Sequence, residues 1–119
     1  MSDYNRRLGQ YGENLAAEFL IRRGCRIIDQ NFATPYGELD LIATNGDEIL
    51  FIEVKTRTNV TYGYPEIAVD TKKLNHLQKA IRIYLEQHRL QMNWRLEIIS
   101  IELNKLKKTA KIRRFSIDH

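Results

Sequence analysis

The chain has 119 residues, of which 43% are hydrophobic and 29% charged, with 19 Lys and Arg residues against 15 Asp and Glu residues. This length predicts one domain over residues 1–119, and the apolar fraction excludes a disordered or fibrous chain. The formal charge of +4 favours an anionic partner but does not identify one.

The cysteine content and the hydrophobic runs exclude further classes. A single cysteine, Cys25, rules out an internal disulfide and a zinc site built from several cysteines. The longest aliphatic or aromatic run covers only residues 49–52, far short of the roughly 20 residues that a membrane span needs. The N-terminus carries no apolar signal core. We therefore expect a cytoplasmic protein that has no membrane partner.

The periodicity of apolar residues predicts the elements in chain order. Helical spacing from about residue 3 to residue 23 ends at Gly24, and a short strand is expected over residues 26–32. Two β-rich runs, residues 38–43 and 48–55, flank Asn45-Gly46 and predict a hairpin. A second helix at about 70–88 precedes strands at 95–102 and 111–117. The order α-β-β-β-α-β-β predicts an α/β (α+β) fold, a mixed sheet flanked by helices.

Charged residues interrupt the apolar hairpin strands in a regular way. Residues two apart share a face of a strand, so Glu38 pairs with Asp40 on one strand, and Glu53 with Lys55 on the next. A hairpin centred near Asn45-Gly46 brings Asp40 towards Glu53. Two close carboxylates need a cation between them, and Mg²⁺ or Mn²⁺ prefers such oxygen ligands. The alternative interpretation is a half-exposed strand with alternating surface charges.

A third carboxylate lies on the first predicted helix. Glu13 falls at the border of the apolar stripe, beside Ala16, Ala17 and Leu20. From there it can reach a site at the sheet edge and bind a metal directly or through water. An ordinary solvated helix glutamate is the alternative.

Three sequence blocks resemble a known family. They are Gly9-Gln-Tyr-Gly-Glu13-Asn-Leu-Ala-Ala17, Gly37-Glu-Leu-Asp40-Leu-Ile and Phe51-Ile-Glu53-Val-Lys55-Thr-Arg57. With Val69, Lys73, Leu77, Ala80 and Tyr84-Leu85, they resemble the YraN-like family of predicted endonucleases. That family is grouped with the PD-(D/E)XK nucleases and looks closest to Holliday-junction resolvases. The match extends from about residue 9 to residue 101, and it implies a restriction-endonuclease-like fold.

The resemblance also implies roles for individual residues. It assigns metal binding to Asp40 and Glu53, the catalytic lysine to Lys55, and a helical acidic position to Glu13. The implied reaction is Mg²⁺-dependent hydrolysis of phosphodiester bonds in DNA, including branched or structured DNA, with the Val54 carbonyl as a further metal ligand. Leu39 precedes Asp40 where the superfamily pattern has proline.

Basic residues predict where a nucleic acid would lie. Residues 103–119 carry six basic residues and one acidic residue, whereas the rest of the chain is close to neutral. We expect a basic C-terminal hairpin at about residues 95–119 that contacts phosphates. The candidate contacts are Arg57, Lys72, Lys73, Lys79, Arg82, Lys105, Lys107, Lys108, Lys111, Arg113 and Arg114. Solvated surface charge is the alternative for each run.

Several functional questions stay open at this stage. DNA is the expected partner, RNA is an alternative, and a homodimer is compatible with the resolvase-like resemblance. Tyr62, Tyr64 and Trp94 are scattered and form no RNA-binding signature. The rivals to an enzyme are a nucleic-acid-binding module of nuclease fold with little catalysis, and a non-enzymatic interaction protein.

Overall fold

The computed structural model describes residues 3–58 and 70–117. The elements in these ranges are α1 (Asp3–Arg22), β1 (Arg26–Thr34), β2 (Gly37–Thr44), β3 (Glu48–Thr58), α2 (Thr71–Gln87), β4 (Asn93–Asn104) and β5 (Thr109–Ile117). This succession confirms the predicted order, with boundaries within a few residues of those expected. Tyr62, Tyr64 and Val69, which the sequence analysis singled out, lie outside the described residues.

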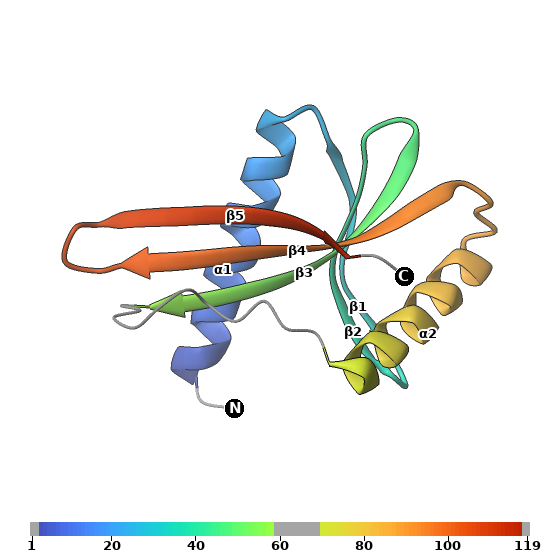
Figure 1. Ribbon diagram of the computed structural model, residues 1–119, viewed down its shortest axis with the longest axis horizontal. Coiled ribbons are helices and arrows are strands. Elements are labelled where there is room, and N and C mark those ends of the chain that lie inside the picture. The colour runs from blue at the N-terminus through green and yellow to red at the C-terminus, as the bar shows by residue number, and fades with distance from the viewer. Residues whose placement is uncertain (1–2, 59–69, 118–119) are drawn as a thin grey trace.

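The five strands form one mixed sheet between two helices, as predicted (Figure 1). The strand order is β1-β2-β3-β4-β5. β3 and β4 pair in parallel, and the other neighbouring strands pair antiparallel. Parallel neighbours need a long crossover, and α2 lies in that connection.

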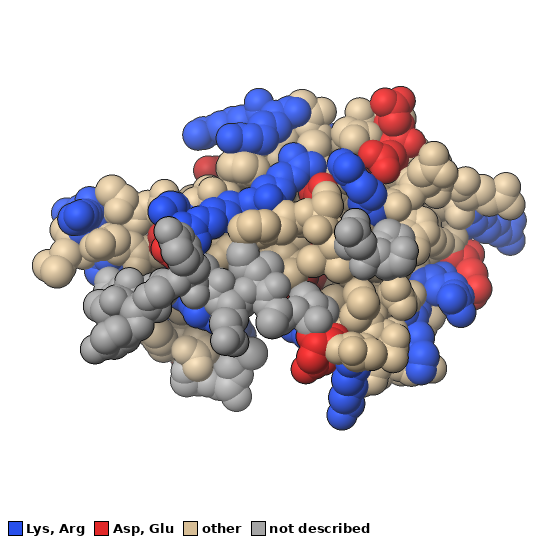
Figure 2. Space-filling model, viewed as in Figure 1, with Lys and Arg blue, Asp and Glu red and all other residues tan. Residues whose placement is uncertain are grey.

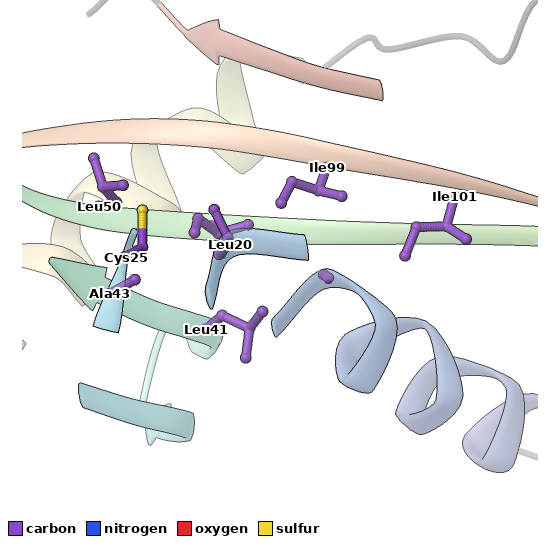
Figure 3. Packing of buried hydrophobic residues seen from close by; sticks show 9 residues of the cluster. Leu20, Cys25, Leu41, Ala43, Leu50, Ile99 and Ile101 are labelled. Carbon is purple, nitrogen blue, oxygen red and sulfur yellow. The ribbon is translucent and has the colours of Figure 1, made fainter. Parts of the chain in front are cut away.

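The α1 helix covers one face of the sheet. Ala16 and Leu20 of α1 are fully buried against Leu41, Leu50 and neighbouring strand residues (Figure 3). Cys25 follows the helix and is buried in the same cluster, as a small apolar side chain would be. Gly24 lies in the left-handed region at φ 87°, which explains why a glycine ends α1.

The α2 helix covers the other face. Ile49 and Phe51 alternate with Leu50 and Ile52 along β3, and they pack against Ile81 and Tyr84 of α2. The strands therefore carry apolar residues on both faces, as expected for a covered sheet. Asp70 caps α2, because its carboxylate accepts a hydrogen bond of 2.7 Å from the Lys73 N–H.

The β2–β3 hairpin turns where the sequence predicts. Gly46 has φ 100°, and the Asn45 side chain accepts hydrogen bonds from the Asp47 and Glu48 N–H groups. The ladder then runs from the Thr44–Ile49 pair to the Leu41–Ile52 pair. That register is fixed by the turn, so it determines which residues of the two strands face each other.

The sheet forks beyond the Leu41–Ile52 pair. β3 stays paired with β4 over its whole length, from Glu48–Asn93 to Thr58–Leu103. The paired stretch of β2 and β3 is much shorter. Figure 1 shows the β1–β2 hairpin turning towards α2 while β3, β4 and β5 continue together. The candidate site lies at this fork.

A close contact fixes α1 against β3 beside the fork. A Cβ atom added at Gly12 would overlap the Thr56 side chain of β3. Gly9, one turn earlier, has open space around the same position. A glycine is thus required at residue 12 for the helix to approach the strand, and it sets the position of Glu13.

Neither described helix is both long and apolar enough to cross a membrane.

Candidate metal and phosphate site at the sheet fork

Asp40 lies at the branch point of the fork. The β2–β3 ladder ends at the Leu41–Ile52 pair, one residue before Asp40 on β2 and before Glu53 on β3. Instead of a main-chain pair, the Asp40 carboxylate accepts a hydrogen bond of 2.8 Å from the Val54 N–H. The side chain therefore stands between the two strands and replaces the backbone ladder where it ends.

The strands around Asp40 are irregular. Leu39 packs in the α2 cluster and Leu41 in the α1 cluster, although residues two apart share a face in a regular strand. The neighbouring strand carries Asn31 at φ 50°, a left-handed conformation that asparagine tolerates better than most residues. The face that β2 turns towards α2 therefore changes between Leu39 and Leu41, on either side of Asp40.

Glu53 meets α2 across the fork. Its carboxylate lies 2.8 Å from the Lys73 ammonium, and its side chain is only 12% exposed. This hydrogen bond is the main cause that raises the pKa of Lys73. Lys73, a predicted nucleic-acid contact, thus lies in contact with the predicted metal ligand Glu53.

Lys55 lies two residues further along β3. Desolvation is the main cause that lowers the pKa of its ammonium, and the nearby positive charge of Lys73 lowers it further. Glu53 opposes this effect. The lysine is thus partly desolvated and electrostatically coupled to the residues around Glu53.

Glu13 of α1 is joined to β1 at the fork by Asn31, a residue that the sequence analysis missed. The side-chain amide of Asn31 donates hydrogen bonds of 2.8 Å to Glu13 and of 2.8 Å to Glu38. One amide thus holds the carboxylates of α1 and β2 together. The left-handed conformation of Asn31 could have been anticipated only from its presence inside an otherwise regular strand pattern.

The carboxylates perturb one another. Burial is the main cause that raises the pKa of Asp40 from 3.8 to about 7; the charges of Glu53, Glu13 and Glu38 contribute to this rise, and the Val54 hydrogen bond opposes it. Burial is also the main cause of the raised pKa of Glu13, to which Glu38 and Glu53 add. Asp40 and Glu13 are therefore harder to ionise than free carboxyl groups.

The chemistry of these oxygen donors fits a hard divalent cation. Asp40 and Glu53 follow the last β2–β3 pair on their strands, and the charge of Glu53 contributes to the raised pKa of Asp40. The Val54 N–H is bonded to Asp40, and the C=O of a strand residue points to the same side as its N–H. Over residues 3–58 and 70–117, no three Asp, Glu, His or Cys side chains are grouped as metal ligands would be. The fit thus rests on two carboxylates and a carbonyl, with Lys73 beside Glu53.

A pocket opens next to these residues, between the β1–β2 hairpin and α2. Its volume is about 350 Å³, and Glu38, Glu53, Lys72 and Lys73 line it together with Tyr36 and His76. The Lys79 ammonium lies 5.1 Å from the centroid of the Tyr36 ring. Acidic and basic side chains thus share one pocket, as required to hold both a cation and a phosphate.

The predicted nucleic-acid contacts fall into two groups. An exposed group consists of Arg57, Lys72, Lys73, Lys79, Arg82, Lys105, Lys107, Lys108 and Lys111. A paired group contains Arg113, which lies 3.5 Å from Glu102, and Arg114, which lies 2.8 Å from the buried Glu97. Figure 2 shows lysine and arginine side chains in a row over β5. The charge of the two arginines is partly offset within the sheet.

Known proteins of several bacteria are similar in sequence to most of this chain. A UPF0102 protein of Syntrophomonas wolfei is 49% identical over 82 residues, covering 69% of this chain and 71% of that protein. A UPF0102 protein of Moorella thermoacetica is 37% identical over 111 residues and 92% of either chain. A UPF0102 protein of Syntrophotalea carbinolica is 40% identical over 95 residues, covering 79% of this chain and 77% of that protein.

A likeness to a solved structure is more distant. The 1.6 Å structure of Archaeoglobus fulgidus Hjc, a Holliday junction resolvase, covers 90% of this chain and 84% of that chain, with 18% identity and a TM-score of 0.47. At these values the likeness says nothing of what this chain binds. The model of the "Uncharacterised protein family UPF0102" matches residues 12–101, which include Glu13, Asp40, Glu53 and Lys55. The chain belongs to this family, and its membership confirms the YraN-like resemblance of its sequence.

Proposed function

We propose that the chain is a divalent-metal-dependent nuclease that hydrolyses phosphodiester bonds in DNA. The observation that carries the proposal is the Asp40–Glu53 pair at the fork, where burial and neighbouring carboxylates raise the pKa of Asp40 to about 7. Carboxylates that interact electrostatically in a partly buried site are typical of a catalytic centre. The proposal includes the preference for branched or structured DNA that the family resemblance implies.

Each residue has a role that follows from its position. Asp40, Glu53 and the Val54 carbonyl would hold Mg²⁺ or Mn²⁺, and Glu13 would join them directly or through water. When bound, such an ion lowers the pKa of a coordinated water and polarises a phosphate. Lys55, with its lowered pKa, orients the attacking water or offsets the charge that develops on the phosphate. Asn31 holds Glu13 and Glu38 in place through its two hydrogen bonds.

Cleavage of a substrate panel tests this proposal. Labelled single strands, duplexes, flaps and four-way junctions are incubated with Mg²⁺, Mn²⁺ or EDTA. We expect metal-dependent cleavage that falls at least about 100-fold in Asp40→Asn and in Lys55→Met, since each removes a group from the reacting centre. Asp47→Asn is the matched control, because Asp47 is exposed in the β2–β3 turn. Cleavage that persists equally in both site variants, or in EDTA, would contradict the mechanism.

One observation favours a second candidate, a nucleic-acid-binding module of nuclease fold with little catalysis. Lys73 occupies Glu53 with an ion pair of 2.8 Å, so a cation must compete with an ammonium for this carboxylate. Titration calorimetry with Mg²⁺ and Mn²⁺ separates the two functions. Heat of binding that disappears in Asp40→Asn supports the enzyme. DNA binding without any metal binding supports the module.

A further inference from the structure

A second pocket lies apart from the acidic fork. Its volume is about 500 Å³, and it lies between the N-terminal half of α1, the end of β3 and the β4–β5 hairpin. The α1 side is formed by Tyr4, Arg7, Leu8 and Tyr11, which recur at three- and four-residue steps and so share one helix face. Neither the metal candidates nor the proposed chemistry uses any of these four residues.

The two tyrosines of this pocket are unusually exposed. The exposed fractions are 48% for Tyr4 and 53% for Tyr11, although both lie on the face that α1 turns towards the hairpin. An aromatic ring costs free energy when it faces water, and a tyrosine pair beside a concave apolar surface is typical of a ligand site. Leu8, Leu103 and Ala110 supply the apolar part of the lining.

The Tyr4 ring is held in position by the hairpin. The Lys105 ammonium donates a hydrogen bond of 2.8 Å to the Tyr4 hydroxyl and lies 4.8 Å from the ring centroid. This hydrogen bond is the main cause that lowers the pKa of Tyr4. A ring fixed at its hydroxyl end presents its face with less loss of rotational freedom when a ligand stacks on it.

The charge of the pocket selects an anion. Arg7, Lys105 and Lys108 line it, and no Asp or Glu is found among the described residues of the lining. The fork, by contrast, is crowded with carboxylates. An occupant with a flat apolar surface and negative charge matches both features of the second pocket. A nucleotide has this combination in its base and its phosphate.

The pocket shares two elements with the fork. Tyr11 and Tyr4 come two and nine residues before Glu13 on α1. They therefore lie about 3 Å and about 14 Å from it along the helix axis, but on the opposite flank of the helix. Thr58 lines the pocket on β3, the strand that also carries Glu53 and Lys55.

We propose that this second pocket binds an unpaired nucleotide of a single-stranded segment, with its base stacked on Tyr4 or Tyr11 and its phosphates on the three cations. Unpaired bases expose the face that aromatic rings stack on, whereas bases in a duplex are covered by their neighbours. The choice of nucleic acid as the occupant rests on the proposed function. The single-strand preference rests on the pocket itself.

Binding measurements without catalysis test this inference. The full chain is titrated, in EDTA, against a fluorescent 12-nucleotide dT strand and against a 12-base-pair duplex. Stacking on one tyrosine contributes about 5- to 150-fold in affinity. We expect Tyr4→Ala with Tyr11→Ala to weaken single-strand binding at least about 10-fold. The matched control, Tyr4→Phe with Tyr11→Phe, keeps the rings but removes the Lys105–Tyr4 hydrogen bond, and its loss of affinity is expected to be clearly smaller than that of the alanine pair. Lys108→Gln is expected to reduce the salt dependence by about one phosphate contact.

Each other outcome overturns the proposal. Wild-type affinity in the alanine pair excludes stacking in this pocket, and equal losses in the alanine and phenylalanine pairs point to the hydroxyls. Equal losses for duplex and single strand exclude the preference for an unpaired base, and no single-strand binding by the wild type excludes this occupant. Thermal unfolding of the alanine pair verifies that it is folded. If tyrosine-dependent binding is found without cleavage, the proposed nuclease function fails and this inference stands. If cleavage is found without tyrosine-dependent binding, this inference fails and the proposed nuclease function stands.

Discussion

Two acidic side chains, Glu97 and Asp40, are held by the sheet in opposite ways. Glu97 on β4 is 2% exposed, and its carboxylate receives hydrogen bonds from Arg114 at 2.8 Å and from Ser116 at 3.4 Å. Arg95 adds an ion pair at 3.5 Å. Asp40 on β2 receives the Val54 N–H and is surrounded by the negative charges of Glu13, Glu38 and Glu53.

The difference separates a structural carboxylate from one that is available for chemistry. Two arginines and a hydroxyl compensate for the desolvation of Glu97, so its burial supports the β4–β5 pairing. The desolvation of Asp40 is not compensated in this way, and the result is a raised pKa. The fold thus keeps Asp40 buried beside other carboxylates, at a cost in stability that a bound cation would reduce.

Asp40→Asn should give the largest change. For Asp40, whose pKa rises from 3.8 to about 7 on folding, the stabilising contribution is present below about pH 4 and is lost as the pH rises through 7. Asparagine keeps an acceptor for the Val54 N–H and carries no charge. In EDTA at pH 8, we expect the free energy of unfolding to increase by up to about 4 kcal/mol, and by almost nothing at pH 4.

Urea unfolding at several pH values measures this effect. Asp47→Asn, in the exposed turn, is the control and is expected to change little at any pH. A site variant that is less stable than the wild type at pH 8 would show that Asp40 is compensated after all.

Glu97→Gln should change stability in the opposite direction. Removing the charge leaves the Arg114 and Arg95 guanidinium groups without their buried partner. Loss of one member of a buried ion pair typically costs about 3 kcal/mol. Urea unfolding provides the measurement, with Glu102→Gln as the control, because the Glu102–Arg113 pair is longer and more exposed. Similar losses in the two variants would remove the distinction drawn for Glu97.

Gly12→Ala should give a smaller change that links stability to the fork. The added methyl group overlaps Thr56, so α1 must move away from β3. Such overpacking costs about 1–3 kcal/mol. The matched control Gly9→Ala meets open space and is expected to stabilise the helix by about 0.5–1 kcal/mol. Thermal unfolding compares the two variants, and equal shifts would mean that α1 does not depend on this contact.

Much of the site could be predicted from the chain alone. Asn45-Gly46 determines the hairpin register, which places Asp40 and Glu53 directly after the last β2–β3 pair. The position of Glu13 at the border of an apolar stripe likewise follows from helical periodicity. These are local rules, in which the turn type and the period of two or 3.6 residues determine the outcome.

The remaining features depend on distant contacts. Asn31 joins Glu13 to Glu38 only because β1 is distorted at φ 50° and lies under α1. Lys73 lies on α2, in the connection between β3 and β4, and forms an ion pair with Glu53 of β3. Arg114, predicted as a phosphate contact, is bound to Glu97, a residue that the sequence presents as one charge in an ordinary strand. No local pattern indicates which charges are neutralised after folding.

The unequal pairing of β3 has a mechanical consequence. Along one edge β3 is paired with β4 from end to end, which gives Glu53 and Lys55 a rigid support. Along the other edge the pairing of β3 with β2 stops at the Leu41–Ile52 pair, so no main-chain ladder joins the two strands at Asp40. In the proposed metal site, the spacing of the two carboxylates would then depend on the position of the β1–β2 hairpin relative to β3.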